Sequence, residues 1–239
     1  MKQINIIILS SSRFSAYSSS ILHLLQKNNY KISLVVIKKI YGLHEVKLRL
    51  RREKLKIIRK IYKKIIIQIL NSFGIKSKQM DGFTKFYNSV SGIRNLIKNL
   101  KINNINFIET ENFHKKKITK LIAEQSPDLI IFTGGGIIRK QLLELPKIGI
   151  LNCHMGILPK YRGMDCTSWA LYNNDYSNVG CTTHLMNEGI DTGPIIKNYF
   201  VDVKKNSTIC NLEKKIEFMM ANCILESIKI LLKKQNKII

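Results

Sequence analysis

The chain has 239 residues, 45% of them hydrophobic, and its 40 basic and 16 acidic side chains give a formal net charge of +24. This length suits one domain with a sizeable core and is short for two, and the hydrophobic fraction argues against a disordered chain. So much charge attracts polyanions such as nucleic acid or anionic lipid, but Lys, Ile and Asn are enriched together along the whole chain, so the charge also has a purely compositional explanation.

Short apolar runs near the N-terminus predict strands that are buried on both faces of a parallel sheet. The first run is INIIIL, Ile4 to Leu9, and the polar stretch SSSRFS closes it. A helical pattern from Ser18 to Asn28 follows, and ISLVVI, Ile32 to Ile37, is the second predicted strand. A strand, a helix and a strand in this order indicate a βαβ unit.

The segment from about 44 to 100 interrupts this alternation and is predicted to be an insertion. Within 45–66, ten Lys or Arg lie between Lys47 and Lys64, against two acids. Apolar residues recur there at three- and four-residue spacing, as in an amphipathic helix: Leu55, Ile58, Tyr62, Ile65 and Ile69. Such a basic helix either lies peripherally on an anionic membrane or on RNA, or packs its apolar stripe on the core with its charges in solvent.

The second half of the chain returns to short apolar runs. Strands are predicted at Asp128 to Phe132, before three glycines, at Gly149 to His154, at Val179 to Met186, and in PIIKNYFVDV. Thr208 to Lys234 is predicted to be a long helix, because apolar residues recur at helical spacing: Leu212, Ile216, Met219, Met220, Cys223, Ile224, Ile228 and Leu231. We therefore predict a single α/β domain over 1–239, a Rossmann-like open, largely parallel sheet with helices on both faces and a basic helical insertion.

The number and spacing of the cysteines and the lack of long apolar runs favour a reducing, cytoplasmic compartment. Five cysteines, an odd number with no C-x-x-C pair, argue against a disulfide framework or a zinc ribbon. The apolar run in MKQINIIILSSSRF is too short for a signal-peptide core, and no run reaches 18 apolar residues without a charge. We expect a cytoplasmic protein that binds no metal and does not cross a membrane.

The stretch NCHMGILPKYRG gathers polar residues at the end of a predicted strand. Asn152 and His154 are two residues apart, so their side chains point to the same face of the sheet. In open α/β sheets, ligands bind at this carboxyl end of the strands. Pro159 stiffens the following loop, while Gly156 and Gly163 allow the close approaches that a loop around a ligand needs.

Asp191 follows the next predicted strand, in the turn NEGIDTGPII. If the two strands are parallel neighbours, their loops converge and bring Asp191 to His154. A carboxylate beside an imidazole favours its protonated form, and an imidazolium and an Asn amide can both donate to a developing oxyanion. No serine or cysteine nucleophile stands in this pattern, and Cys153 is expected to face the core. The set therefore suits acyl transfer directly to an external amine, with the carboxylate or its bound water relaying the proton.

Each of these residues also has an ordinary structural explanation. A single histidine at a strand end is more often structural than catalytic, and Asp before Thr-Gly-Pro is a common turn former. His184 lies inside the strand CTTHLM, where we predict a packing role. His23, His44 and His114 have no evident partner in the sequence and are assigned no role.

Three stretches together resemble the catalytic domain of the folate-dependent formyltransferases: LNCHMGILPKYRG, WALYNN and GCTTHLMNEGIDTGPII. That superfamily includes methionyl-tRNA, glycinamide ribonucleotide and sugar N-formyltransferases. The resemblance implies formyl transfer from 10-formyltetrahydrofolate to a primary amine, with Asn152, His154 and Asp191 as the catalytic residues. It also implies that two backbone segments bind the pterin: Gly136, Ile137 and Ile138, with Asn187, Glu188 and Gly189. Gly156 departs from the pattern, because many members have a serine there.

The resemblance leaves three acceptors open. Relatives that use glycinamide ribonucleotide have a glycine-rich phosphate loop after the first strand; SSSRFSAYSSS has no glycine, although Ser11 and Arg13 can meet a phosphate. The tRNA enzymes continue into a separate tRNA-binding domain, whereas only 192–239 follow the catalytic aspartate here. An amino sugar, nucleotide-linked and destined for a lipopolysaccharide or another surface polysaccharide, is the expected acceptor, with Tyr161 and Arg162 as further substrate contacts. A non-catalytic folate- or nucleotide-binding module is the alternative, and a homodimer is compatible with either.

Overall fold

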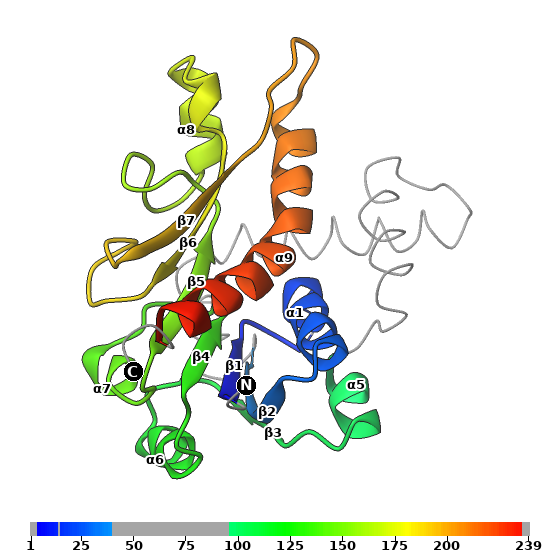
Figure 1. Ribbon diagram of the computed structural model, residues 1–239, viewed down its shortest axis with the longest axis vertical. Coiled ribbons are helices and arrows are strands. Elements are labelled where there is room, and N and C mark those ends of the chain that lie inside the picture. Colours follow the sequence, from blue (N-terminus) through cyan, green and yellow to red (C-terminus); the bar gives the residue numbers. More distant parts are fainter. Residues whose placement is uncertain (1–3, 14, 40–95, 236–239) are drawn as a thin grey trace, which may run out of the picture.

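A computed structural model of the chain describes residues 4–13, 15–39 and 96–235. Its strands are β1 (Asn5–Ser10), β2 (Lys31–Lys38), β3 (Phe107–Thr110), β4 (Leu129–Phe132), β5 (Gly149–His154), β6 (Gly180–Leu185) and β7 (Ile195–Phe200). They form one sheet in the order β3-β2-β1-β4-β5-β6-β7 (Figure 1). The first five pair in parallel, and β6 and β7 are antiparallel to their neighbours. The predicted Rossmann-like, largely parallel sheet is confirmed.

Helices cover both faces of this sheet. They are α1 (Ala16–Lys27), α5 (Leu96–Ile102), α6 (Lys116–Glu124), α7 (Lys140–Leu143), α8 (Cys166–Tyr172) and α9 (Ile209–Gln235), and Tyr176–Asn178 form a short 3₁₀ turn. Buried side chains of α1, α5 and α9 pack on one face, and those of α6 and α7 pack on the other. The expectation of helices on both faces is therefore confirmed.

Alternation along the central strands divides the core into these two layers. In β1, Ile6 and Ile8 join the cluster under α1 and α9, whereas Ile7 and Leu9 join the cluster under α6 and α7. A strand that is buried on both faces needs the continuous apolar run from which it was predicted. Ser15 begins α1 by accepting a hydrogen bond from the Ser18 N–H (3.1 Å).

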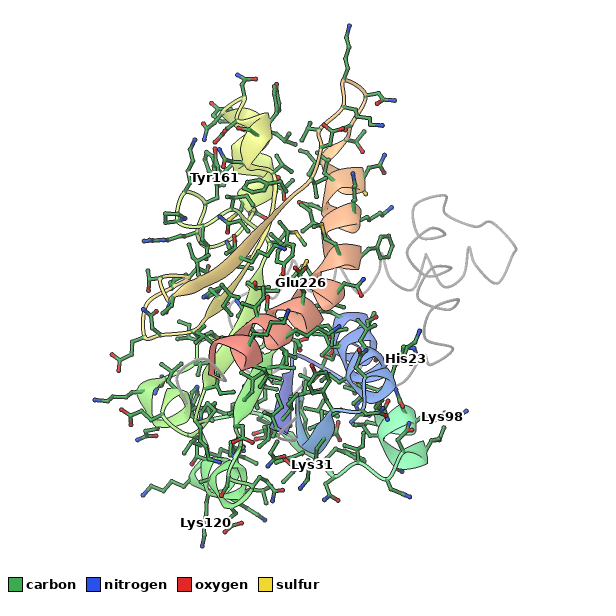
Figure 2. The ribbon with its side chains drawn as sticks, in the orientation of Figure 1. His23, Lys31, Lys98, Lys120, Tyr161 and Glu226 are labelled. Carbon is green, nitrogen blue, oxygen red and sulfur yellow. The ribbon has the colours of Figure 1, made fainter. Side chains whose placement is uncertain are left out.

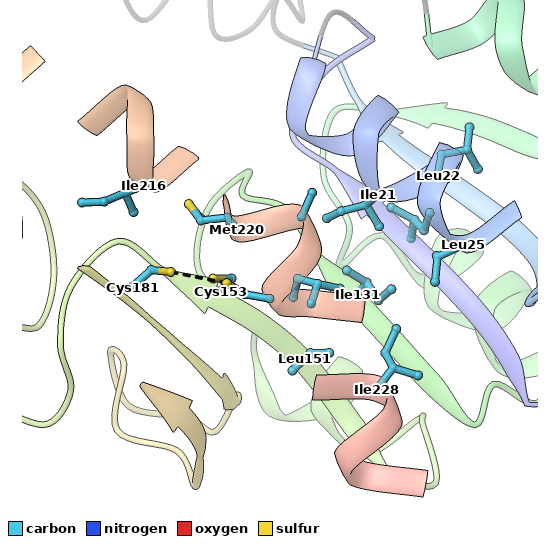
Figure 3. Packing of buried hydrophobic residues seen from close by; sticks show 14 of the residues in the cluster. Ile21, Leu22, Leu25, Ile131, Leu151, Cys153, Cys181, Ile216, Met220 and Ile228 are labelled. Atoms are coloured by element: carbon cyan, nitrogen blue, oxygen red, sulfur yellow. Dashed lines mark hydrogen bonds between the residues drawn. The ribbon is translucent and has the colours of Figure 1, made fainter. Parts of the chain in front are cut away.

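In the larger of the two layers, helices α1 and α9 pack on the central strands of the sheet. Figure 3 shows Ile21 and Leu25 of α1 and Ile216 and Ile228 of α9 around the sheet. Cys153 of β5 lies in the same layer and is 4% exposed, so the prediction that it faces the core is confirmed.

The prediction that the strands before and after the NCHMGILPKYRG loop run in parallel is wrong. The last residue of β5, His154, is the cross-strand partner of Thr182, near the start of β6. The connection 155–179 therefore begins and ends at one edge of the sheet, and a strand entered from that edge runs back antiparallel. Figure 1 shows α8, which lies in this connection, beyond the ends of the strands.

Most of the predicted insertion, including the basic helix at 45–66, lies outside the described residues. Its last part belongs to the core, because α5 begins at Leu96, and Leu96 and Leu100 are buried against the larger layer. Within 4–13, 15–39 and 96–235, no helix combines the length and the apolar character that a membrane span requires.

Candidate active site

Asn152 and His154 end β5 on the face opposite to the buried Cys153. They share the face of Ile150, which belongs to the layer under α6 and α7. No helix follows β5 directly there, since the chain turns into the loop 155–165. The His154 side chain is only 8% exposed and the Asn152 residue is half-buried. A reacting group held at this pair is therefore largely removed from water.

Asp191 reaches these residues from the loop after β6. A backbone hydrogen bond from Leu185 N to Pro194 O (2.9 Å) closes that loop. Within it, Asp191 adopts a left-handed conformation, with φ at +50°. One carboxylate oxygen lies 3.4 Å from His154 Nδ1 and accepts a hydrogen bond from Gly163 N (3.0 Å). The structure thus brings Asn152, His154 and Asp191 together, although through an antiparallel pair of strands.

His184, for which we predicted only a packing role, belongs to the same cluster. It is the cross-strand partner of Asn152, so its ring lies on the same face. His184 Nε2 lies 3.2 Å from Asn152 Nδ2 and 3.6 Å from the second oxygen of Asp191. The side chain is 1% exposed. The contact depends on the antiparallel pairing of β5 and β6, whereas our sequence analysis took these strands as parallel.

The contacts of His184 define how it binds Asn152. Burial lowers the pKa of the His184 imidazole, against the weaker opposing effects of the Leu185 carbonyl and the Asp191 carboxylate. The neutral ring donates from Nδ1 to Leu185 O (3.1 Å), which leaves Nε2 as an acceptor for the Asn152 amide. This hydrogen bond fixes one amide hydrogen of Asn152 and thereby the orientation of the whole group.

Both ring nitrogens of His154 face hydrogen-bond acceptors. Nδ1 faces the Asp191 carboxylate, and Nε2 lies 3.0 Å from the backbone oxygen of Tyr161. An imidazole that donates from both nitrogens is an imidazolium, so this environment complements the protonated ring. Gly156 leaves room for it, because a Cβ at that position would lie 2.7 Å from His154 Nε2. The glycine at this departure from the family pattern therefore fits the observed position of the ring.

Cys166, which had no role in our sequence analysis, also touches His154. Its sulfur lies 3.4 Å from His154 Nε2, so the His154 ring contacts Asp191 through one nitrogen and Cys166 through the other. Burial, with a smaller contribution from the nearby carboxylates of Asp191 and Asp165, raises the pKa of the Cys166 thiol to about 11. Because only the thiolate is a strong nucleophile, Cys166 is poorly suited to attack at neutral pH. No spacing rule in the sequence points to this contact.

The first predicted pterin segment follows β4. Gly134, Gly135 and Gly136 all have φ between 104° and 119°, a conformation that favours glycine. Ile137 is 70% exposed, whereas Ile138 is buried in the layer under α6 and α7. The second segment, Asn187, Glu188 and Gly189, is exposed in the loop that carries Asp191. There Asn187 Oδ1 accepts hydrogen bonds from Gly189 N (3.1 Å) and Thr192 Oγ1 (2.7 Å).

The predicted substrate contacts are only partly gathered at this site. Ser11 lies beside Gly134, at the same edge of the sheet. Arg13 instead binds Glu109, with Nε and Nη2 donating at 3.1 and 3.0 Å. Tyr161, labelled in Figure 2, turns its hydroxyl to Asp175 (2.8 Å) and offers the site only its backbone oxygen. Arg162 is exposed. In the part of the chain that the structure describes, no group of three or more His, Cys, Asp or Glu is placed to hold a metal ion.

Comparison with known proteins agrees on one family. A family model described as formyl transferase matches residues 4–228. A methionyl-tRNA formyltransferase of Clostridioides difficile is 34% identical over 137 residues, which are 56% of this chain and 44% of that protein. One from Thermodesulfovibrio yellowstonii is 34% identical over 122 residues, covering 51% of this chain and 38% of its own length. The chain thus matches less than half the length of these curated relatives.

Solved structures share the fold over nearly the whole chain. A phosphoribosylglycinamide formyltransferase from Bacillus halodurans has a TM-score of 0.63 and 17% identity, covering 97% of this chain and 96% of that one. The enzyme of the same name from Anaplasma phagocytophilum has a TM-score of 0.64 and 16% identity, covering 98% and 88%. At this identity the likeness shows the fold alone.

Proposed function

The chain belongs to the formyl transferase family, and from that premise we propose that it transfers a formyl group from 10-formyltetrahydrofolate to a primary amine. The observation that carries the proposal is the cluster of Asn152, His154 and Asp191 at one edge of the sheet, with both nitrogens of His154 facing acceptors. A module that only binds folate has no need for two oriented donors and a carboxylate in contact.

The residues of the cluster have different roles in the reaction. The folate, when bound, supplies the formyl group that the amine attacks. Asn152 donates a hydrogen bond to the formyl oxygen as negative charge develops on it, and His154 does so from Nε2, which exchanges the Tyr161 carbonyl for that oxygen. Because His154 is buried and Asn152 is half-buried, these bonds are strong. Asp191, directly or through water, takes the proton that the attacking amine loses and passes it toward the nitrogen that leaves. Direct transfer needs no covalent enzyme intermediate.

The residues near the site fit a flat heterocycle such as a pterin. The three glycines after β4 leave backbone without side chains on which such a ring can lie. Ile137 of the first predicted pterin segment is 70% exposed, and Ile190, the residue after the second segment, is 63% exposed, so each offers apolar surface. We propose that these segments hold the folate, with Gly136, Ile137 and Ile138 on one side and Asn187, Glu188 and Gly189 on the other.

We propose further that the acceptor amine carries phosphate. The names of the relatives support methionyl-tRNA and glycinamide ribonucleotide more than the amino sugar that we expected from the sequence. All three acceptors are phosphate-bearing when the sugar is nucleotide-linked, and a net charge of +24 favours any of them. Ser11 and Arg13 remain candidates for contact with that phosphate, provided that Arg13 exchanges Glu109 for it.

The test is formyl transfer by the purified chain to each acceptor in turn. Methionyl-tRNA, glycinamide ribonucleotide and a panel of nucleotide-linked amino sugars are supplied with 10-formyltetrahydrofolate, and release of tetrahydrofolate is followed together with mass analysis of the acceptor. We expect turnover with one acceptor class and no release without it. Folate binding without turnover of any acceptor would instead favour the non-catalytic module.

A further inference from the structure

The glycine loop after β4 needs outside support to keep one shape. Three consecutive glycines, Gly134 to Gly136, lack the side chains that restrict a backbone, so an unsupported loop of this kind samples many conformations. A ligand that binds such a loop must order it, which weakens binding. Residues that order the loop beforehand therefore strengthen binding.

Two side chains from other segments bind the carbonyl oxygens of this loop. Lys38, the last residue of β2, donates from Nζ to Gly135 O at 2.7 Å. His114, in the turn after β3, lies with Nε2 3.0 Å from Ile137 O and donates to it, because a carbonyl only accepts. Our sequence analysis assigned neither residue a role.

A buried ring supports the loop from beneath. Phe113 is 3% exposed and lies against Gly135, where an added Cβ would come within 2.9 Å of the ring. The loop is therefore held at two carbonyls and seated on a fixed surface. All of these contacts come from the β2 and β3 side of the sheet.

The two carbonyl contacts also determine where two amide hydrogens point. In a planar trans peptide, the C=O of one residue and the N–H of the next point in opposite directions. With the oxygens of Gly135 and Ile137 turned toward β2 and β3, the N–H groups of Gly136 and Ile138 point toward β5. The active-site pair ends β5, on the other side of β4. Neither N–H finds a hydrogen-bond acceptor among the residues that the structure describes.

We propose that Lys38 and His114 are positioning residues that clamp this loop, so that the N–H groups of Gly136 and Ile138 donate to acceptor atoms on the edge of the folate ring. The inference rests on the proposed function, since it takes the folate as the ligand. Neither side chain contacts the formyl group or Asn152, His154 and Asp191 in this arrangement. The clamp therefore affects binding of the donor and leaves the chemical step unchanged.

The test uses the full chain with Lys38→Met and His114→Leu, each of which removes one donor. Lys39→Met is the matched control, because Lys39 is the next residue, is exposed, and carries the same charge as Lys38. His114→Gln restores an N–H donor of similar reach. Two quantities are measured: hydrogen exchange of the amides at 134–138 without ligand, and the Kd of 5-formyltetrahydrofolate, a stable isomer of the formyl donor.

We expect each donor-removing variant to speed exchange at 134–138 and to raise the Kd about tenfold, the effect of losing one hydrogen bond. Lys39→Met and His114→Gln should stay within about threefold of wild type, and kcat at saturating donor should stay within about twofold in all variants. Unchanged exchange and Kd in both Lys38→Met and His114→Leu would overturn the clamp. A wild-type protein that binds no folate would overturn the proposed function and the ligand assigned here, whatever the exchange rates show.

Discussion

Asp191 connects the two histidines of the site with the loop that follows β5. Its carboxylate contacts His154 and His184 and accepts the Gly163 N–H. Asp191→Asn keeps the shape and an acceptor oxygen for Gly163, but removes the charge and the group that takes a proton. We expect kcat to fall by about 10³, within the range for loss of a positioned proton acceptor.

The control for this variant is Asp202→Asn, which removes an equal charge from an exposed position. Circular dichroism and the Kd for folate should be close to wild type in both proteins. A kcat within about threefold of wild type in Asp191→Asn would contradict the role of the carboxylate.

His184 orients Asn152, so its removal should affect the rate more than binding. His184→Leu deletes the acceptor at Nε2 and lets the Asn152 amide rotate, and we expect kcat to fall about 10²-fold, as when one oxyanion donor is lost. His184→Gln places an amide oxygen near the former Nε2 and should recover activity to within about tenfold of wild type. Steady-state kinetics measure both variants, and an equal loss in Leu and Gln would contradict the orientation role.

Cys166 contacts His154, which in turn contacts Asp191, an order of contacts that in other enzymes activates a thiol nucleophile. The raised pKa of this thiol argues for direct transfer instead. We expect Cys166→Ser to keep kcat within about threefold, because the hydroxyl fills nearly the same space and no thioester is needed. A loss of 100-fold, with a formyl adduct on the wild-type protein by mass spectrometry, would establish a covalent route.

How far the sequence predicts such a site depends on the kind of contact. Asn152 and His154 follow from period-two geometry, which is local. Asp191 comes close to them because β6 runs antiparallel to β5. The sequence pattern did not predict this direction, since it depends on the edge of the sheet at which the 25-residue connection 155–179 returns. His184 and Cys166 need the register of β5 against β6 and the packing of α8, which are tertiary facts.

One buried hydroxyl helps to hold the connection between β5 and β6 in place. Thr182 is the cross-strand partner of His154 and is fully buried. Its Oγ1 accepts the Leu158 N–H (3.0 Å) and lies 2.7 Å from both Gly156 O and Asn198 Oδ1. The loop beside the reacting groups is thereby tied to β6 and β7.

Thr182→Val keeps the side-chain shape but leaves the buried Leu158 N–H and its neighbours without this hydroxyl. We expect the free energy of unfolding to fall by about 1–3 kcal/mol, measured by urea denaturation, and kcat to fall with it because the loop carries Gly156. Thr119→Val, whose hydroxyl bonds only within the exposed turn of α6, is the control. Equal stability of the two variants would contradict the anchoring role of Thr182.

At the scale of elements, apolar patterns predict most of the strands and two helices of the larger layer. Five strands, β1, β2, β4, β5 and β6, and the helices α1 and α9 lie within two residues of their predicted bounds, whereas β7 ends three residues before its predicted end. β3 escaped prediction because it is a four-residue edge strand, FIET, with no continuous apolar run. The four-residue α7 is likewise too short for any helical periodicity to show. Both are stabilised by neighbours that lie far away in the sequence.

At the scale of the whole molecule, the acceptor is the least predictable property. The fold is shared with proteins whose names specify different acceptors, so it does not distinguish among those acceptors. The net charge of +24 favours every phosphate-bearing acceptor, but salt should separate tRNA from the small acceptors. A polyanion contacts many basic side chains at once, whereas a small phosphate ester contacts few.

Binding of tRNA should therefore depend steeply on salt. Each phosphate that a basic side chain neutralises releases counterions, so an interface of several contacts loses affinity by orders of magnitude as salt rises. We expect the Kd for tRNA, measured by fluorescence anisotropy, to rise at least about tenfold between 50 and 200 mM KCl, while the Kd for 5-formyltetrahydrofolate changes less than about threefold. A Kd for tRNA that stays constant over this range would mean that the basic side chains do not act together on a polyanion, and that the charge of the chain is compositional.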